Sequence, residues 1–75
     1  MNWFASHRQD WIADMLRVYG FITRSHLQRK FGISCAQAAL DFRAFNDANP
    51  DAMKYDNRKK VYLASEAPKT LLAQL

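Results

Sequence analysis

The segment Leu27-Gln28-Arg29-Lys30-Phe31-Gly32-Ile33-Ser34 joins two expected helices and carries the signals for a sharp turn between them. Leu27 and Phe31 are spaced i, i+4, which places both on one face of a short helix. The glycine that follows favours the left-handed conformation in which helices end. Ser34 is a preferred N-cap, and the position of Gln37 predicts a capping box at the start of the next helix. The segment therefore predicts two helices held at a steep angle.

Apolar residues with helical spacing precede this segment. They recur at i, i+1, i+4, i+5 and i+8, which is the pattern of one helix face. This pattern predicts a first helix from about Ser6, or a few residues earlier, to Tyr19, and Gly20 is placed to end it. The residues that make up the predicted face are Trp11, Ile12, Met15, Leu16 and Tyr19.

A short extended segment and two further helices are expected after the first helix. Phe21-Ile22 is too short for more than a tiny strand or an extended link. The short helix after it opens at Thr23 or at Arg24-Ser25. A third helix is predicted from Cys35 to about Ala48, because apolar residues follow there at i, i+4 and i+7. Its predicted buried residues are Ala38, Phe42 and Phe45.

Residues 53–64 alternate between apolar and polar side chains on both sides of a basic tip, which predicts a β-hairpin. Its turn has no Asn-Gly pair, so the loop is expected to have four or more residues. The tail Ser65-Glu66-Ala67-Pro68 can cap a last short helix. We therefore expect residues 1–64 to form one domain and residues 65–75 a short C-terminal helix.

The expected order of helix, short strand, helix, turn, helix and hairpin is that of a winged helix-turn-helix. The fold class is mainly α with a small β-hairpin. In such a fold the helix after the turn is the recognition helix, whose N-terminal residues enter the major groove of DNA. The hairpin tip is the wing.

Composition and charge narrow the possible functions. The chain has 75 residues and a net charge of +4, which suits a polyanionic partner without proving one. The excess falls in two blocks: residues 24–30 hold three basic residues and no acidic one, and residues 58–60 are all basic. If the fold brings these blocks to one side, they form a footprint for phosphates. Residues 35–50 sum to −1, which counts mildly against strong DNA binding and keeps a protein-binding winged helix as an alternative.

Several classes of protein are excluded by what the sequence lacks. No apolar run approaches the roughly 20 residues of a membrane span, and no secretory signal opens the chain. One cysteine and two separated histidines give neither an internal disulfide nor a zinc site. We expect a cytoplasmic protein without a metal or cofactor. No catalytic set of residues is visible, so we expect no enzyme.

The candidate DNA-binding residues have simpler structural roles as alternatives. The basic residues can form solvated surfaces or bind phosphates. Gln37 can close the capping box or pair with adenine, and Leu40 can pack on the wing or on another chain. Asp41 is most simply an intramolecular partner for a nearby arginine. The expected DNA-binding residues are Arg24, Ser25, Arg29, Lys30, Ser34, Cys35, Ala36, Gln37, Ala39, Leu40, Arg43, Arg58, Lys59 and Lys60.

Apolar residues at both chain ends are left over once the core is assigned. We expect them to pair across a two-fold axis and form a homodimer that reads a palindromic operator. The alternative is that the tail folds back on the first helix of its own chain. The expected interface residues are Trp3, Phe4, Leu71, Leu72 and Leu75.

Two stretches resemble one family of regulators. They are Arg24-x-x-Leu27-x-x-x-Phe31-Gly32-Ile33-Ser34-x-x-Gln37-Ala38-x-x-Asp41-Phe42 and Pro50-x-x-Met53-x-Tyr55-Asp56 with Lys60-x-Tyr62. They are similar to the N-terminal winged helix of WYL-domain transcriptional regulators, of the BrxR and CapW type that represses phage-defence islands. Those regulators continue into a ligand-sensing WYL domain, which this chain lacks. The resemblance implies either a stand-alone version, such as one from a mobile element, or a DNA-binding domain alone.

We therefore expect sequence-specific binding to double-stranded DNA and regulation of transcription, more specifically repression. One alternative within DNA binding is an excisionase-like factor that bends DNA. The alternative from another class is a winged helix that binds proteins, with its wing in solvent.

Overall fold

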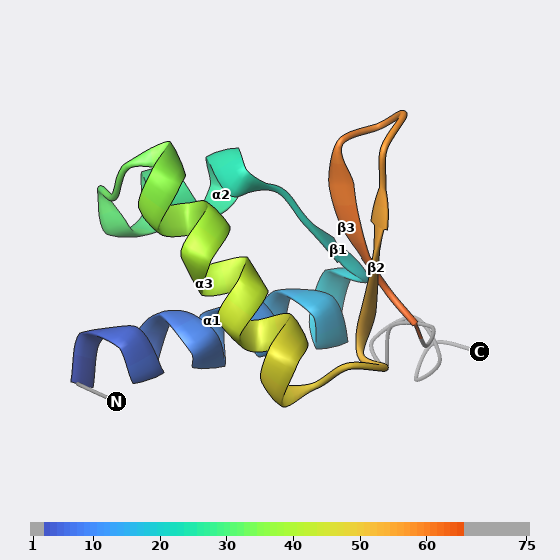
Figure 1. Cartoon of the computed structure of the whole chain (residues 1–75), viewed down its shortest axis with the longest axis horizontal. Helices are drawn as coiled ribbons and strands as arrows, with labels where there is room; N and C mark the ends of the chain where they lie inside the picture. The colour runs from blue at the N-terminus through green and yellow to red at the C-terminus, as the bar shows by residue number, and fades with distance from the viewer. Residues whose placement is uncertain (1–2, 66–75) are drawn as a thin grey trace.

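A computed structural model describes residues 3–65, and its first element is a helix, α1, that spans Trp3–Tyr19 (Figure 1). Gly20 ends α1 with a φ of 83° and donates its N–H to the Leu16 carbonyl at 3.0 Å. Ile12 and Leu16 are buried, as predicted from the apolar spacing. Tyr19 is 62% exposed, so its predicted place on the buried face is wrong. It is the last residue of the helix, where regular packing of the helix face stops.

The helix α2 spans Arg24–Phe31 and follows the two-residue strand β1, Phe21–Ile22. Its N-terminus carries a capping box that the sequence analysis did not predict. Thr23 Oγ1 accepts from the His26 N–H at 3.1 Å, and His26 Nδ1 accepts from the Thr23 N–H at 3.2 Å. Gly32 caps the other end in the left-handed conformation, with a φ of 63°. His26 is therefore part of a helix cap.

The helix α3 spans Cys35–Ala48, as predicted. Ser34 is its N-cap, because its hydroxyl accepts from the Gln37 N–H at 3.0 Å. The predicted capping box is only half right. The Gln37 side chain donates to Asp41 Oδ1 at 3.1 Å instead of accepting from the Ser34 backbone. The Gln37 amide makes a stronger hydrogen bond when it donates to the charged, buried Asp41 carboxylate than when it accepts from an exposed backbone N–H.

The hairpin consists of β2, Met53–Asp56, and β3, Val61–Ala64, joined by the four-residue loop 57–60. With β1 these strands form an antiparallel sheet in the order β1-β3-β2. The Asp56 carboxylate accepts from the backbone N–H groups of Arg58 at 2.9 Å and Lys59 at 3.1 Å. Lys60 closes the loop with a positive φ of 56°, a conformation that favours glycine or asparagine.

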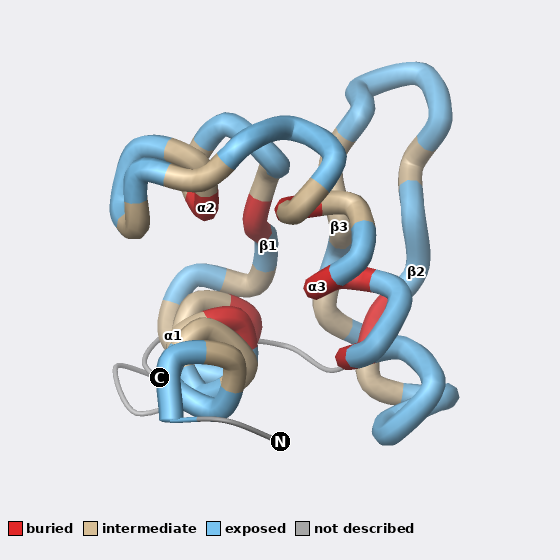
Figure 2. The backbone as a smooth tube through the Cα atoms, turned by 60° about the vertical axis from the view of Figure 1, so that its left-hand side comes forward, coloured by how far each residue is buried: buried red, intermediate tan, exposed pale blue. Residues whose placement is uncertain are grey.

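The core lies where α1, α2 and α3 meet one face of the sheet (Figure 2). The buried apolar residues are Ile12, Leu16, Ile22, Leu27, Ala38, Phe42, Phe45 and Met53. Tyr55 pairs with Tyr62 directly across the ladder, so both side chains lie on the same face of the hairpin. In Figure 1 the hairpin stands beside the helices with its loop pointing away from α1. The predicted winged helix-turn-helix order is confirmed.

The expected C-terminal helix and its three leucines lie outside the described residues. The predicted boundary between the domain and this tail therefore stays a prediction. Within residues 3–65, the structure contains no helix that is both long enough and apolar enough to span a membrane.

Candidate nucleic-acid interface

One face of α3 is open to solvent and holds the residues expected to meet bases. Ala36, Leu40 and Arg43 are spaced along this face, and Leu40 is 56% exposed. Within residues 3–65, Leu40 packs neither into the core cluster nor against it. The open face separates two flanks of α3, which differ in chemistry. We name them the hairpin flank, with Ala39 and Phe42, and the α1 flank, with Gln37 and Asp41.

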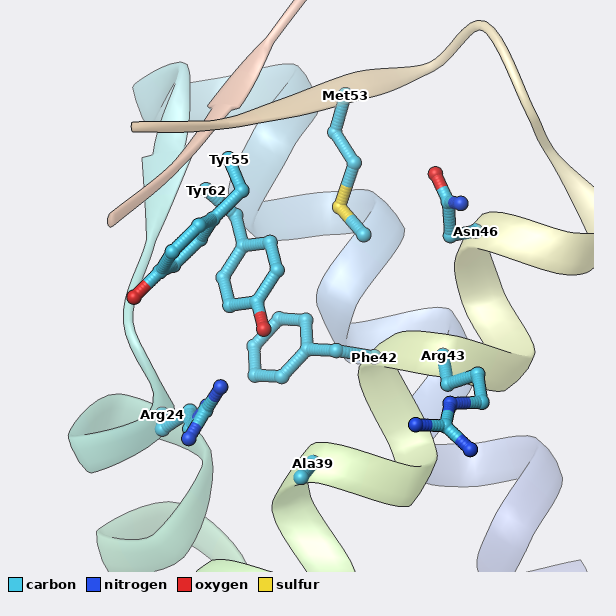
Figure 3. Close-up of a pocket in the computed structure, with 8 residues that line it drawn as sticks. All are labelled: Arg24, Ala39, Phe42, Arg43, Asn46, Met53, Tyr55 and Tyr62. Atoms are coloured by element: carbon cyan, nitrogen blue, oxygen red, sulfur yellow. The ribbon is translucent and has the colours of Figure 1, made fainter. Parts of the chain in front are cut away.

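The hairpin flank borders a groove of about 390 Å³ between α3 and the sheet (Figure 3). The Phe42 and Tyr62 rings stack there with centroids 4.0 Å apart and planes 7° apart. Tyr55 packs against Tyr62 at 4.8 Å. This aromatic contact joins the hairpin to α3. The residues that line the groove are Arg24, Ala39, Phe42, Arg43, Asn46, Met53, Tyr55 and Tyr62.

Two arginines from different helices reach this groove. In Figure 3 Arg24 from α2 and Arg43 from α3 lie on either side of Ala39. Interaction with the Tyr62 hydroxyl, and to a smaller extent with the Cys35 thiol, raises the pKa of the Arg24 guanidinium. The guanidinium is a cation at any physiological pH in either case. Arg24 therefore brings a positive charge to the groove, and the small Ala39 side chain leaves the space between the arginines open.

The basic block 24–30 divides in the structure. Arg29 and Lys30 lie about 140° and 240° around α2 from Arg24, at 100° per residue. They are exposed at the C-terminal end of the helix. In Figure 1 this end of α2 and the hairpin loop lie at opposite ends of the long axis of the molecule. The basic block is therefore split: Arg24 lines the groove, and Arg29 and Lys30 lie at the other end of α2.

The hairpin loop presents the third group of cations. Arg58, Lys59 and Lys60 are exposed. The Asp56 carboxylate is taken up by the loop backbone, so it shapes the loop without pairing with these cations. Across residues 3–65 the ion pairs are Arg8–Asp41 and Arg17–Asp14. The loop cations are thus available to a partner.

The α1 flank is closed by a buried ion pair. Asp41 is 5% exposed, and its two carboxylate oxygens accept from Arg8 Nε at 2.6 Å and Arg8 Nη2 at 3.2 Å. Gln9 also donates to the Asp41 backbone carbonyl at 2.8 Å. The predicted intramolecular arginine partner of Asp41 is confirmed. The carboxylate also accepts from Gln37, so one buried group links α1 to the start of α3.

A family model described as the BrxR transcriptional regulator winged helix-turn-helix domain matches residues 6–74. The chain belongs to this family. The predicted resemblance is thus confirmed for the winged helix.

Curated relatives of this BrxR-type domain carry the name DNA-binding transcriptional repressor CapW. The relative from Escherichia coli (strain KTE188) is 38% identical over 65 residues, and the one from Pseudomonas aeruginosa is 38% identical over 70 residues. A third, from Stenotrophomonas maltophilia, is 34% identical over 65 residues. These matches cover 87%, 93% and 87% of this chain but only 22%, 23% and 22% of the relatives. The chain spans less than a quarter of their length.

The residues predicted from sequence for the BrxR-type domain lie on α2, on α3 and in the hairpin loop. Arg24 and Ser25 are exposed at the start of α2, and Arg29 and Lys30 at its end. Ser34, Cys35 and Ala36 are exposed at the start of α3. Leu40 and Arg43 are exposed further along it, whereas Gln37 and Ala39 are half-buried on its two flanks. Arg58, Lys59 and Lys60 occupy the hairpin loop.

Four groove residues of the BrxR-type domain were missed by the sequence analysis. Tyr55 and Tyr62 could have been found, because strand alternation puts them on the same face as Met53. Asn46 could have been found from its spacing of seven residues after Ala39. The residues involved are Asn46, Met53, Tyr55 and Tyr62. The part of the chain that the structure describes has no group of three potential metal ligands.

Proposed function

We propose that this BrxR-type domain binds double-stranded DNA with sequence specificity and represses transcription by occupying an operator. The observation that carries the proposal is the placement of Arg24 and Arg43 beside the open face of α3. The names of the CapW relatives support it. Repression of this kind takes place in the cytoplasm.

The roles of the residues follow from their places. The N-terminal half of α3 enters the major groove, where Ala36, Gln37 and Leu40 meet base edges. Ser34 and Cys35 lie at its N-terminus, which suits a phosphate or a base edge. Backbone phosphates lie against the charged and polar residues around α3. These are Arg24, Ser25, Arg43, the loop residues Arg58, Lys59 and Lys60, and Arg29 with Lys30 at the far end.

The negative charge of residues 35–50 weighs less against DNA than the sequence suggests. One of its two carboxylates, Asp41, is buried and paired with Arg8. The exposed part of α3 therefore holds Arg43 and Asp47, which cancel. The phosphates of DNA do not meet an acidic surface.

A protein partner is the second candidate function for the open face of α3. The exposed Leu40 side chain favours it, because an apolar residue at the centre of the face gains from burial against another chain. Contact of Leu40 with a thymine methyl group accounts for the same exposure. A test of DNA binding separates the two.

We also propose a homodimer. Trp3 and Phe4 are 68% and 67% exposed, although both are large and apolar. A second copy would cover them and would align two recognition helices on a palindromic site. Sedimentation of the chain at tens of micromolar, ~10⁻⁵ M, tests this. A monomer at that concentration would contradict it.

The proposed DNA binding is tested by fluorescence anisotropy with the duplex upstream of the chain's own gene and a scrambled duplex, over a salt series. We expect preference for the first and an affinity that falls steeply with salt. Lys59→Ala with Lys60→Ala should weaken binding to both duplexes and reduce the log–log slope by up to about 0.9 per lysine. Arg17→Ala is the control, because Arg17 pairs with Asp14 on the exposed side of α1.

Each outcome has a distinct meaning. No affinity for either duplex would overturn DNA binding and favour the protein partner. Binding with an unchanged slope in the lysine variant would remove the hairpin from the interface but keep the function.

A further inference from the structure

The amide of Gln37 has a fixed orientation in the free protein. Its Nε2 donates to Asp41 Oδ1 at 3.1 Å. An ionised carboxylate only accepts hydrogen bonds, so the nitrogen of the amide faces Asp41 and the oxygen faces away. In residues 3–65 the Gln37 side chain has no other hydrogen bond. One N–H and the carbonyl oxygen are therefore left for a partner.

The carboxylate that orients Gln37 is itself held from α1. Arg8 contacts both of its oxygens, at 2.6 and 3.2 Å, and its planar guanidinium restricts the rotation of the carboxylate. Gln9 fixes the backbone of the same residue through the Asp41 carbonyl, at 2.8 Å. An exposed carboxylate could rotate and would not hold the amide in one orientation. Asp41 is only 5% exposed, and it bonds Arg8, Gln9 and Gln37.

The bond to Asp41 is compatible with reading a base. Bidentate pairing of glutamine with adenine uses the amide oxygen and one N–H on the same edge of the amide. The other N–H points away from that edge and is the one free to bond a carboxylate. The amide can thus keep its bond to Asp41 while its pairing edge meets the base.

We propose that Arg8 and Asp41 are positioning residues for Gln37, which reads an adenine in the bound DNA. They hold its amide in the pairing orientation before the DNA arrives, so that little side-chain freedom is lost on binding. This inference rests on the proposed function. The inference goes beyond the proposed function because it assigns an effect on sequence preference to a buried ion pair on the α1 flank.

A pair of double variants separates positioning from support of the fold. Arg8→Met with Asp41→Leu removes the ion pair and the acceptor for Gln37 while roughly keeping the volume, a replacement that folds tolerate. Arg8→Met with Asp41→Asn removes the same ion pair but keeps a carbonyl oxygen at the position of the acceptor. Gln37→Ala removes the reading group. Circular dichroism establishes that each variant is folded before it is assayed.

The wild-type chain first selects its preferred sites from a duplex library with a randomised centre. Anisotropy with every single-base-pair change of the selected site then gives the preference at each position. Gln37→Ala should lose about 5- to 150-fold of preference at one A·T pair. The Leu double variant should lose about 2- to 12-fold at the same pair only, the range for freeing one ordered side chain. The Asn double variant should retain the preference. Adding Gln37→Ala to the Leu variant should cause no more loss than Gln37→Ala alone.

Two results would overturn the positioning role. One is an unchanged preference at the Gln37 position in a folded Leu variant, and the other is an equal loss at all positions, which indicates a displaced helix. Failure of the wild type to select any site would instead overturn the proposed function.

A measurement on the wild type keeps the inference testable if the double variants do not fold. The two side-chain amide protons of Gln37 are followed by NMR as the selected duplex is added. The proton bonded to Asp41 should keep its chemical shift, and the other should move as it meets the base. Movement of both protons to new shifts would show that the amide leaves Asp41 on binding and would overturn the inference.

Discussion

The two flanks of α3 are held by different chemistry. On the α1 flank, directed polar bonds at 2.6 to 3.2 Å converge on the buried carboxylate of Asp41. On the hairpin flank, Phe42 meets Tyr62 through stacked rings, and an open groove lies beside them. Hydrogen-bonded ion pairs tolerate little rotation or sliding, whereas stacked rings can slide at a modest cost. We therefore expect the α1 flank to fix the rotation of α3 more firmly than the hairpin flank does.

Loss of one partner on the α1 flank should have the largest effect. Asp41→Ala leaves the half-buried Arg8 without its counter-charge, which should lower the free energy of unfolding by about 3 kcal/mol. Urea denaturation followed by circular dichroism measures it. Asp14→Ala breaks the exposed pair with Arg17 and should change stability by no more than about 1 kcal/mol. Equal losses in the two variants would show that the Asp41 pair contributes no more than an exposed ion pair.

Loss of the aromatic contact should cost less. Tyr62→Ala removes a half-buried ring stacked on Phe42, which should lower the free energy of unfolding by about 2–3 kcal/mol. Tyr62→Phe keeps the ring and removes only the hydroxyl that interacts with Arg24, so its stability should stay close to that of the wild type. The same denaturation assay compares them. A phenylalanine variant as unstable as the alanine variant would mean that the hydroxyl and not the stack joins the hairpin to α3.

The groove cations should affect DNA binding without affecting the fold. Arg24→Gln and Arg43→Gln should each reduce the log–log salt slope by up to about 0.9, because each removes one proposed phosphate contact. Stability should change by no more than about 0.5 kcal/mol, as for other surface substitutions. Arg17→Gln is the matched control on α1. A slope equal to that of the wild type in both groove variants would separate the groove from the DNA surface.

The smallest effect is expected at the hairpin loop. Lys60→Gly relieves a positive φ that costs a side-chain-bearing residue about 1–2 kcal/mol, offset by the greater freedom of glycine in the unfolded chain. The net gain should be about 0.5 kcal/mol, seen as a small rise in Tm. Lys59→Gly removes the same charge at a position without positive φ and should lower Tm. A lower Tm in both variants would argue against strain at Lys60.

Local signals predicted the helices well and the contacts between them poorly. The bounds of α3 follow from a serine cap and an apolar period, which act over a few residues. The partner of Asp41 was predicted as an arginine, but Arg8 lies 33 residues away in the chain, and no local pattern connects them. The same holds for the stack of Phe42 on Tyr62. Arg24 was grouped with Arg29 and Lys30 because they are neighbours in sequence, whereas the helix turns them to different sides.

The strand order β1-β3-β2 has a consequence for the time course of synthesis. Phe21 pairs with Leu63, and the Gly20 carbonyl accepts from the Ala64 N–H at 2.9 Å. The strand β3, which pairs with both β1 and β2, is thus the last of the three strands to be synthesised. On the ribosome, α1, α2 and α3 can form as they emerge, but the edge of β1 stays unpaired until β3 has left the exit tunnel. In a nascent chain α3 would therefore form before the hairpin is paired, and the groove between them would form last.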